Sequence, residues 1–101
     1  AYYNRAAVYT ALSEYQQAIE DYDTAIELVP DLALGYNNRG FAYYALGEYE
    51  QAIQNYDKAI ELIPDFALAY YNRSLGLRRL KQQESADRDL VKACDLDSNL
   101  C

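Results

Sequence analysis

The fold is decided by one stretch, GYNNRGFAYYALGEYEQAIQNYDKAIELIPDFAL, residues 35–68, because the chain contains it more than once. Residues 1–34 agree with it at 21 of 34 positions. Residues 69–101 agree with residues 35–67 at nine of 33 positions. Self-similarity at a fixed period of this length is typical of stacked structural units. We therefore divide the chain into repeat 1 (1–34), repeat 2 (35–68) and a degenerate repeat 3 (69–101).

Within each repeat the apolar residues recur at the spacing of an α-helix, in two segments separated by a short break. In repeat 2, Gly40 and Ala52 are small residues at places where two helices approach closely, and tyrosine rings fill the space around them. The pattern predicts six helices. Their expected ranges are 1–12, 15–28, 33–46, 49–62, 67–80 and 83–96.

The breaks between helices carry recognisable end signals. Gly47 in repeat 2 is a typical residue for ending a helix. Ser13 stands at that position in repeat 1, and with Gln16 it has the pattern of a capping box that opens the next helix. Asp31 and Asp65, each directly after a proline, are expected to cap the helices that follow.

A family resemblance lies in an ordered set of residue types in repeat 2. The set is Tyr36, Arg39, Gly40, Tyr43, Ala52, Tyr56 and Pro64. It resembles the pattern W-x-x-L-G-x-x-Y…A-x-x-x-F…P of the tetratricopeptide repeat family, at that family's 34-residue period. The resemblance implies an all-α fold, a right-handed solenoid of three helix-turn-helix units with six antiparallel helices. It covers residues 1–101 as a single domain, and the lack of any methionine suggests a fragment of a longer protein.

An arginine recurs once per repeat, at Arg5, Arg39 and Arg73, where the family usually has leucine. The long stem of an arginine can lie along apolar surface while its guanidinium reaches the edge. Carboxylates recur on the second helices of the repeats, at Asp23, Asp57 and Asp89. We predict a structural ladder in which each arginine pairs with an aspartate of its own or a neighbouring repeat. The alternative is a row of arginines that holds acidic ligands.

The resemblance also implies a binding site, because in this family the first helix of every unit lines a concave groove for an extended peptide or a partner helix. Carried over, the groove consists of Tyr3, Asn4, Asn37, Asn38, Phe41, Tyr44, Tyr71, Asn72, Leu75, Arg78 and Arg79, with Ala7 and Thr10 beside them. Asparagine recurs at one place in each repeat and offers a donor and an acceptor to a peptide backbone. Alternatively, these amides only bond between helices.

One subfamily holds the C-terminal carboxylate of chaperone peptides with a clamp of lysines and asparagines. The corresponding positions here are Tyr3, Ala7, Asn38, Leu68 and Asn72, and only Asn38 clearly fits. We therefore expect no chaperone-tail carboxylate clamp. A neutral, aromatic groove favours an amphipathic or aromatic segment, with an acidic end toward Arg78 and Arg79. These two arginines could equally form a solvated helix face.

The charge of the chain bears on its partners. A formal net charge of −7 argues against nucleic acid and anionic lipid, since both need a basic surface. No apolar run reaches the roughly 18–20 residues of a membrane span. A cytoplasmic location is expected, with the periplasm left open.

Enzyme chemistry finds little support in the residues. The chain has no histidine, and its four glycines are isolated, so neither a histidine base nor a glycine-rich phosphate loop is present. Asp95, Asp97 and Asn99 have the spacing that opens a calcium loop, but Leu100 stands where glycine is required. Cys94 occupies an apolar helical position and is expected to be a buried thiol. We predict no catalytic residue, metal or cofactor.

These observations favour a non-catalytic scaffold for protein–protein interaction that binds a peptide or helix in its concave groove. The alternative is a self-assembly element that forms homo-oligomers by stacking through the ends of its solenoid. Repeat 3 is followed by no distinctly polar capping helix and repeat 1 begins abruptly, so apolar surface is expected at both ends.

Overall fold

The computed structural model describes residues 2–101, which form six α-helices and one short 3₁₀ helix. The helices are α1 (Tyr2–Ala11), α2 (Tyr15–Leu28), α3 (Ala33–Ala45), α4 (Tyr49–Leu62), α5 (Ala67–Arg79), α6 (Gln83–Leu96) and η1 (Ser98–Leu100). The predicted ranges are confirmed, with the first helix of each repeat ending one residue earlier than expected. Each helix within residues 2–101 is too short or too polar to cross a bilayer.

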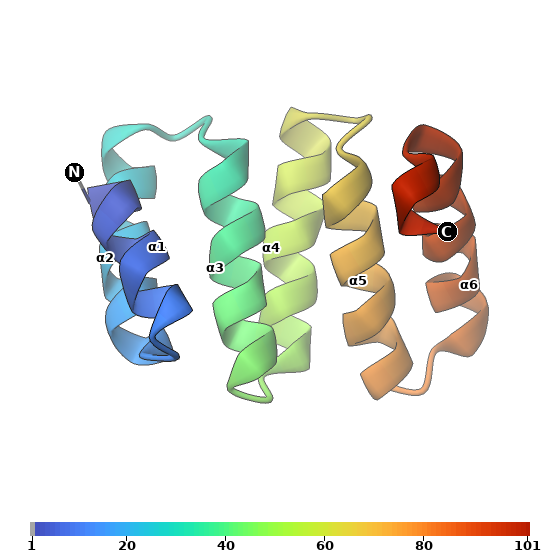
Figure 1. Cartoon of the computed structure of the whole chain (residues 1–101), viewed down its shortest axis with the longest axis horizontal. Coiled ribbons are helices and arrows are strands. Elements are labelled where there is room, and N and C mark those ends of the chain that lie inside the picture. Colours follow the sequence, from blue (N-terminus) through green and yellow to red (C-terminus); the bar gives the residue numbers. More distant parts are fainter. Residues whose placement is uncertain (1) are drawn as a thin grey trace.

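The helices form three antiparallel hairpins that stand side by side in a row (Figure 1). Each repeat contributes one hairpin, and the second helix of a hairpin packs on the first helix of the next, as α2 does on α3 and α4 on α5. Helices α1, α3 and α5 follow one another along one side of the row (Figure 1). This arrangement confirms the predicted all-α solenoid.

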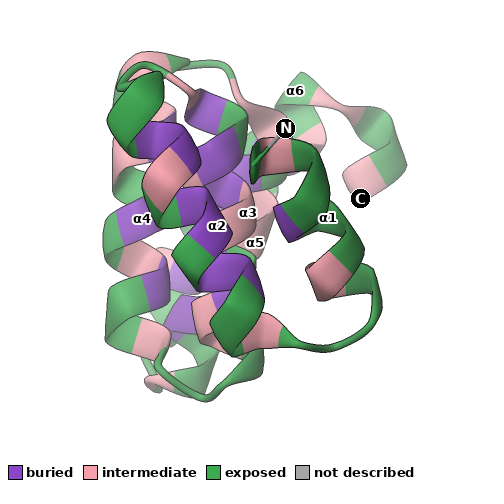
Figure 2. Ribbon diagram, turned by 90° about the vertical axis from the view of Figure 1, so that its left-hand side faces the viewer, coloured by how far each residue is buried: buried purple, intermediate pink, exposed green. Residues whose placement is uncertain are grey.

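The core consists mainly of alanines, with two tyrosine rings and the side chains of Ile19, Ile26 and Leu77, and it lies where the helices face one another (Figure 2). Tyr22 and Tyr56 are the largest fully buried side chains, and burial raises the pKa of both hydroxyl groups. A Cβ atom on Gly40 would lie 2.7 Å from the Tyr56 ring and 3.1 Å from the carbonyl oxygen of Ala52. Small residues at these two positions therefore bring α3 and α4 into close contact, as the sequence predicted.

The three turns inside the hairpins share one geometry. Ser13, Gly47 and Lys81 have φ angles of 61°, 80° and 64°. In each turn the next N–H bonds back to a carbonyl five residues earlier, as from Glu14 to Tyr9 at 2.8 Å. This is the Schellman motif, in which a residue of left-handed conformation closes the helix.

The predicted side-chain caps are wrong. Glu14, not Ser13, precedes α2, and its side chain makes no capping bond. Ser13 instead ends α1 in the left-handed conformation that Gly47 adopts in repeat 2, because the two residues occupy the same turn. Leu32 and Phe66 precede α3 and α5 without side-chain capping bonds, so Asp31 and Asp65 do not cap these helices.

Replacing Ser13 with glycine is expected to raise the free energy of unfolding by about 0.5–1 kcal/mol, because glycine adopts positive φ without steric cost. Chemical denaturation of the variant beside the parent measures the change. A loss of a few tenths of a kcal/mol would instead indicate a capping serine. Gly47→Ala is the matched control and should lose stability, since it places a side chain in the same strained conformation.

The C-terminus folds back onto α6. Cys94 and Cys101 form a disulfide across η1, which corrects the expectation of a buried free thiol at Cys94. The Asp97 carboxylate accepts a hydrogen bond from the Asn99 N–H at 3.0 Å and so caps η1. Asp97 of the acidic pattern at residues 95–99 therefore has a structural role at the start of η1.

Candidate functional site

A hollow of about 350 Å³ opens on the side of the row formed by α1, α3 and α5. We call it the central hollow. Its lining residues are Ala7, Thr10, Tyr22, Asn37, Asn38, Phe41, Leu68 and Asn72. Apart from Tyr22, all of them lie on the first helices of the three repeats. Stacking equivalent helices side by side therefore produces the hollow.

A chain of side-chain amides crosses the central hollow. The Nδ2 group of Asn38 donates to the Tyr3 hydroxyl at 2.9 Å. The Nδ2 group of Asn72 donates to the Oδ1 atom of Asn37 at 3.1 Å, and Asn37 donates to Asn38 at 3.3 Å. These bonds link α1, α3 and α5, so these amides do bond between helices, as the structural alternative for the asparagines predicted. An amide has two N–H donors and two acceptor positions, so Asn38 and Asn72 retain capacity for a ligand.

Burial separates these amides into two groups. Asn37 is only 1% exposed and belongs to the floor beneath the hollow. Asn38 and Asn72 are half-buried, so part of each amide faces the hollow. Phe41, at 40% exposure, is the exposed aromatic group beside them, and its ring packs edge-on against Tyr15 at 6.4 Å. The site thus combines accessible amides with an anchored aromatic surface.

The two arginines at the end of α5 point to different neighbours. The Nε group of Arg79 donates to the Tyr44 hydroxyl at 3.3 Å, which carries its positive charge toward α3, and this bond raises the pKa of Arg79. Arg78 lies 3.5 Å from the Asp87 carboxylate on α6. Arg79 is therefore the arginine of the pair that is bonded to α3.

The structure brings most of the predicted groove residues together. Asn37, Asn38, Phe41 and Asn72 line the hollow, while Tyr3, Tyr44 and Arg79 are joined to the same helices by hydrogen bonds. Tyr71 and Leu75 are half-buried on α5. Asn4 and Arg78 are exceptions. Asn4 lines a separate hollow at the N-terminal end of the row, which Tyr3 also lines, and Arg78 turns to α6.

Tyr22 is a site residue that the sequence did not place in the groove, and Leu68 was named there only as a position of the clamp. Tyr22 belongs to α2. Its ring reaches the hollow beside α1, and its hydroxyl lies 3.5 Å from the Thr10 hydroxyl. The small side chain of Ala7 lines the hollow beside them. Leu68 lies in the first turn of α5. The sequence signal that could have placed Tyr22 in the groove is a large residue on one helix opposite a small residue on the next.

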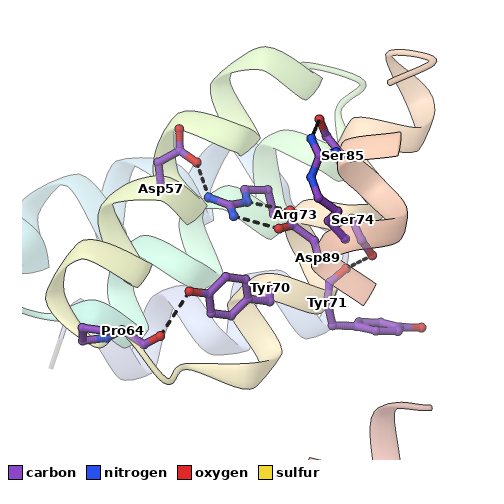
Figure 3. Close-up of polar contacts among 9 residues, drawn as sticks. Asp57, Pro64, Tyr70, Tyr71, Arg73, Ser74, Ser85 and Asp89 are labelled. Atoms are coloured by element: carbon purple, nitrogen blue, oxygen red, sulfur yellow. Dashed lines mark hydrogen bonds and ion pairs between the residues drawn. The ribbon is translucent and has the colours of Figure 1, made fainter. Parts of the chain in front are cut away.

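The predicted arginine ladder is present on the opposite side of the first helices. Arg73 makes two bonds to the Asp89 carboxylate, at 2.7 and 2.8 Å, and one to Asp57 at 2.9 Å (Figure 3). Arg39 bonds to Asp23 at 2.7 Å. Pairing with an aspartate of the same or the preceding repeat is thus confirmed.

Two further contacts of the ladder were not predicted. Arg5 pairs with Asp21, whose carboxylate is 9% exposed, and this hydrogen bond lowers the pKa of Asp21. Each guanidinium also lies over a tyrosine ring three residues earlier, as Arg73 does over Tyr70 at 5.3 Å from the centroid. The recurring separation of 16 residues between arginine and acceptor could have identified Asp21.

The comparisons with known proteins agree with this geometry. A tetratricopeptide repeat model matches residues 33–66, and a TPR repeat model matches residues 6–47. The chain belongs to the tetratricopeptide repeat family. No functionally curated protein matches the sequence.

Solved structures of this family superimpose on nearly the whole chain. The first TPR of Spaghetti (RPAP3) bound to HSP90 peptide SRMEEVD has a TM-score of 0.95 at 23% identity, over 97% of this chain and 78% of its own. The second TPR of the same protein, bound to the same peptide, has a TM-score of 0.93 at 26% identity, over 95% and 89%. MamA has a TM-score of 0.90 at 28% identity, over 97% of this chain and 57% of its own.

The exclusion of a chaperone-tail clamp is contradicted by these structures. Two of them hold an HSP90 peptide on a fold that matches the present one at TM-scores of 0.95 and 0.93. The exclusion compared residue types at five positions only. It left out Arg79, whose Nε group donates to the Tyr44 hydroxyl on α3.

Proposed function

We propose that residues 1–101 form one domain of three repeats that serves as a non-catalytic module for protein–protein interaction. Its site is the concave groove, which takes an extended peptide or a helix of a partner. The observation that carries the proposal is the central hollow, where half-buried amides of Asn38 and Asn72 lie beside the exposed ring of Phe41.

The chemistry of the groove favours one kind of ligand. Side-chain amides can accept from and donate to a peptide backbone whatever its sequence. The Phe41 ring offers apolar contact to an aromatic or aliphatic side chain. Arg79 supplies positive charge at one end, where a ligand carboxylate would form a charge-assisted hydrogen bond. An apolar segment that ends in an acidic group, or in a free C-terminus, fits these three features together.

Peptide display on the chain tests this function, with SRMEEVD included as a defined probe. The parent should enrich a family of sequences, and the double variant Asn38→Ala with Tyr44→Ala should lose them. Glu50→Ala, which changes an exposed residue of α4, is the control and should enrich the same sequences. Binding in the groove is contradicted if the double variant enriches the same sequences as the parent. It is also contradicted if all the proteins are folded and none of them enriches any sequence.

Self-assembly is the second candidate, and an apolar hollow of about 480 Å³ at the N-terminal end favours it. Leu28 and Val29 line this hollow at 67% and 46% exposure. The other end of the row has a second such hollow, of about 460 Å³ on α6, where Val91 is 60% exposed. A mass that rises with concentration while the groove binds no peptide would support assembly over peptide binding.

A further inference from the structure

The three repeats give their arginines different partners. In repeats 1 and 3, the Nε and Nη2 groups of the arginine bond to both oxygens of an aspartate 16 residues later: Arg5 to Asp21 and Arg73 to Asp89. In repeat 2 that position is Asn55. One carboxylate of the ladder is therefore replaced by a neutral amide.

The replacement changes the hydrogen bonding of Arg39. The Oδ1 atom of Asn55 accepts from Arg39 Nε at 2.7 Å. The Nδ2 group of Asn55 donates to the carbonyl of Gln51 at 2.8 Å, so it offers no acceptor to the guanidinium. Asp23 accepts from Nη1. Among residues 2–101, no group accepts a hydrogen bond from Nη2 of Arg39.

Arg39 also has less negative charge around it than Arg73 has. Arg73 lies between two carboxylates, those of Asp57 and Asp89, whereas Arg39 has only that of Asp23. The Arg39 side chain is 21% exposed and stacks on the Tyr36 ring at 5.3 Å from the centroid. The guanidinium is thus held in place while solvent still reaches it.

A pocket of about 290 Å³ opens at this guanidinium, between α3 and α4. We call it the repeat-2 pocket. Its lining residues are Tyr36, Arg39, Tyr43, Gln51, Gln54 and Asn55. None of them lines the central hollow, so the pocket is distinct from the groove. Gln51 and Gln54 are exposed, and their side-chain amides can donate further hydrogen bonds.

We propose that the repeat-2 pocket binds a carboxylate group. The ligand carboxylate accepts from Arg39 Nη2 and supplies the second negative charge that Asp89 supplies to Arg73. A single carboxylate fits better than a phosphate dianion, because the Asp23 carboxylate already lies on the same guanidinium and would repel the additional charge. The carboxylate belongs either to a small organic acid or to an acidic side chain. This inference does not depend on the function of the groove.

Nuclear magnetic resonance of the arginine Nε–H groups tests the site directly. Sodium acetate is titrated against sodium chloride at constant ionic strength. We expect acetate, but not chloride, to shift the Arg39 signal along a saturable curve, while the Arg73 signal stays in place. A blocked Gly-Asp-Gly peptide in a parallel titration separates the two sources. Tighter binding of the peptide than of acetate indicates a side-chain ligand, and the reverse indicates a small acid.

Two substitutions test the site, one by removing it at Arg39 and the other by creating it at Arg73. Asn55→Asp restores the internal carboxylate and should weaken acetate binding at Arg39 at least tenfold. Asp89→Asn should create a saturable acetate response at Arg73, where the parent shows none. Circular dichroism establishes that both variants are folded. The proposal is overturned if acetate shifts Arg39 equally in the parent and in Asn55→Asp, or if Arg73 gains no response in Asp89→Asn.

Discussion

Arg73→Leu is expected to lower the free energy of unfolding by about 3–5 kcal/mol, the usual cost of removing one partner from a buried ion pair. Asp89 is 9% exposed at its side chain, and Arg73 provides two of its hydrogen bonds. Leucine leaves this carboxylate buried without a counter-charge. The hydrogen bond to Asp89 also raises the pKa of Arg73.

Arg39→Leu is the matched comparison, and urea denaturation of both variants measures the difference. Arg39→Leu should lower the free energy of unfolding by less, about 1–3 kcal/mol. Leucine leaves without a partner only the neutral amide of Asn55 and the 54%-exposed carboxylate of Asp23. Equal losses of unfolding free energy in the two variants would show that burial of the carboxylate does not determine how much the ladder stabilises the fold. An unchanged stability of Arg73→Leu would contradict its structural role altogether.

Gly40→Ala is expected to cost about 2–3 kcal/mol, within the range for overpacking a core. The new Cβ atom would lie 2.7 Å and 2.9 Å from two carbons of the Tyr56 ring. That ring is 1% exposed, so it is packed within the core. A backbone carbonyl, that of Ala52, blocks the other direction at 3.1 Å. The gain of about 1 kcal/mol from replacing glycine in a helix offsets only part of this cost.

Gly76→Ala provides the control on α5, where the glycine faces Ile53 of α4, the second helix of the preceding repeat. Its Cβ atom would lie 3.3 Å from Cγ1 of Ile53, an aliphatic atom that can shift by a few tenths of an ångström. The helix gain should therefore balance the contact, and stability should stay within about 0.5 kcal/mol of the parent. If thermal denaturation shows the same loss for both glycines, close packing against Tyr56 is not the reason for Gly40.

The fold was predictable from the sequence because its information is periodic. A repeat of 34 residues fixes which positions are equivalent, and Gly40, Ala52 and Tyr56 then identify where two helices meet. The arginine ladder was predictable for the same reason. Its partner Asp21 was missed because the aspartates were chosen from the position of Asp23, which serves the next repeat.

The details that failed depend on backbone conformation rather than on residue type. Ser13 has the side chain of a helix cap, yet the turn holds it at positive φ, where Gly47 marks the same turn clearly. The disulfide between Cys94 and Cys101 requires η1 to fold back on α6, and no periodic pattern in the sequence predicts that reversal.

The groove was predictable in outline only. Equivalent positions on the first helices placed Asn38, Phe41 and Asn72 in the central hollow. The sequence could not show that Asn37 is buried in the floor, because its burial depends on the neighbouring repeat, where Asn72 bonds to it. It also could not show that Arg79 turns to Tyr44 while Arg78 turns to α6.

The most direct test of the account is to map a bound peptide on the chain by backbone amide chemical shifts. SRMEEVD, or a sequence enriched by display, is added to isotope-labelled protein in increasing amounts. The account predicts that the largest shifts cluster on α1, α3 and α5 around Asn38 and Asn72, and that the outer faces of α2, α4 and α6 stay unchanged. Shifts confined to those outer faces, or to the two ends of the row, would contradict a peptide-binding groove.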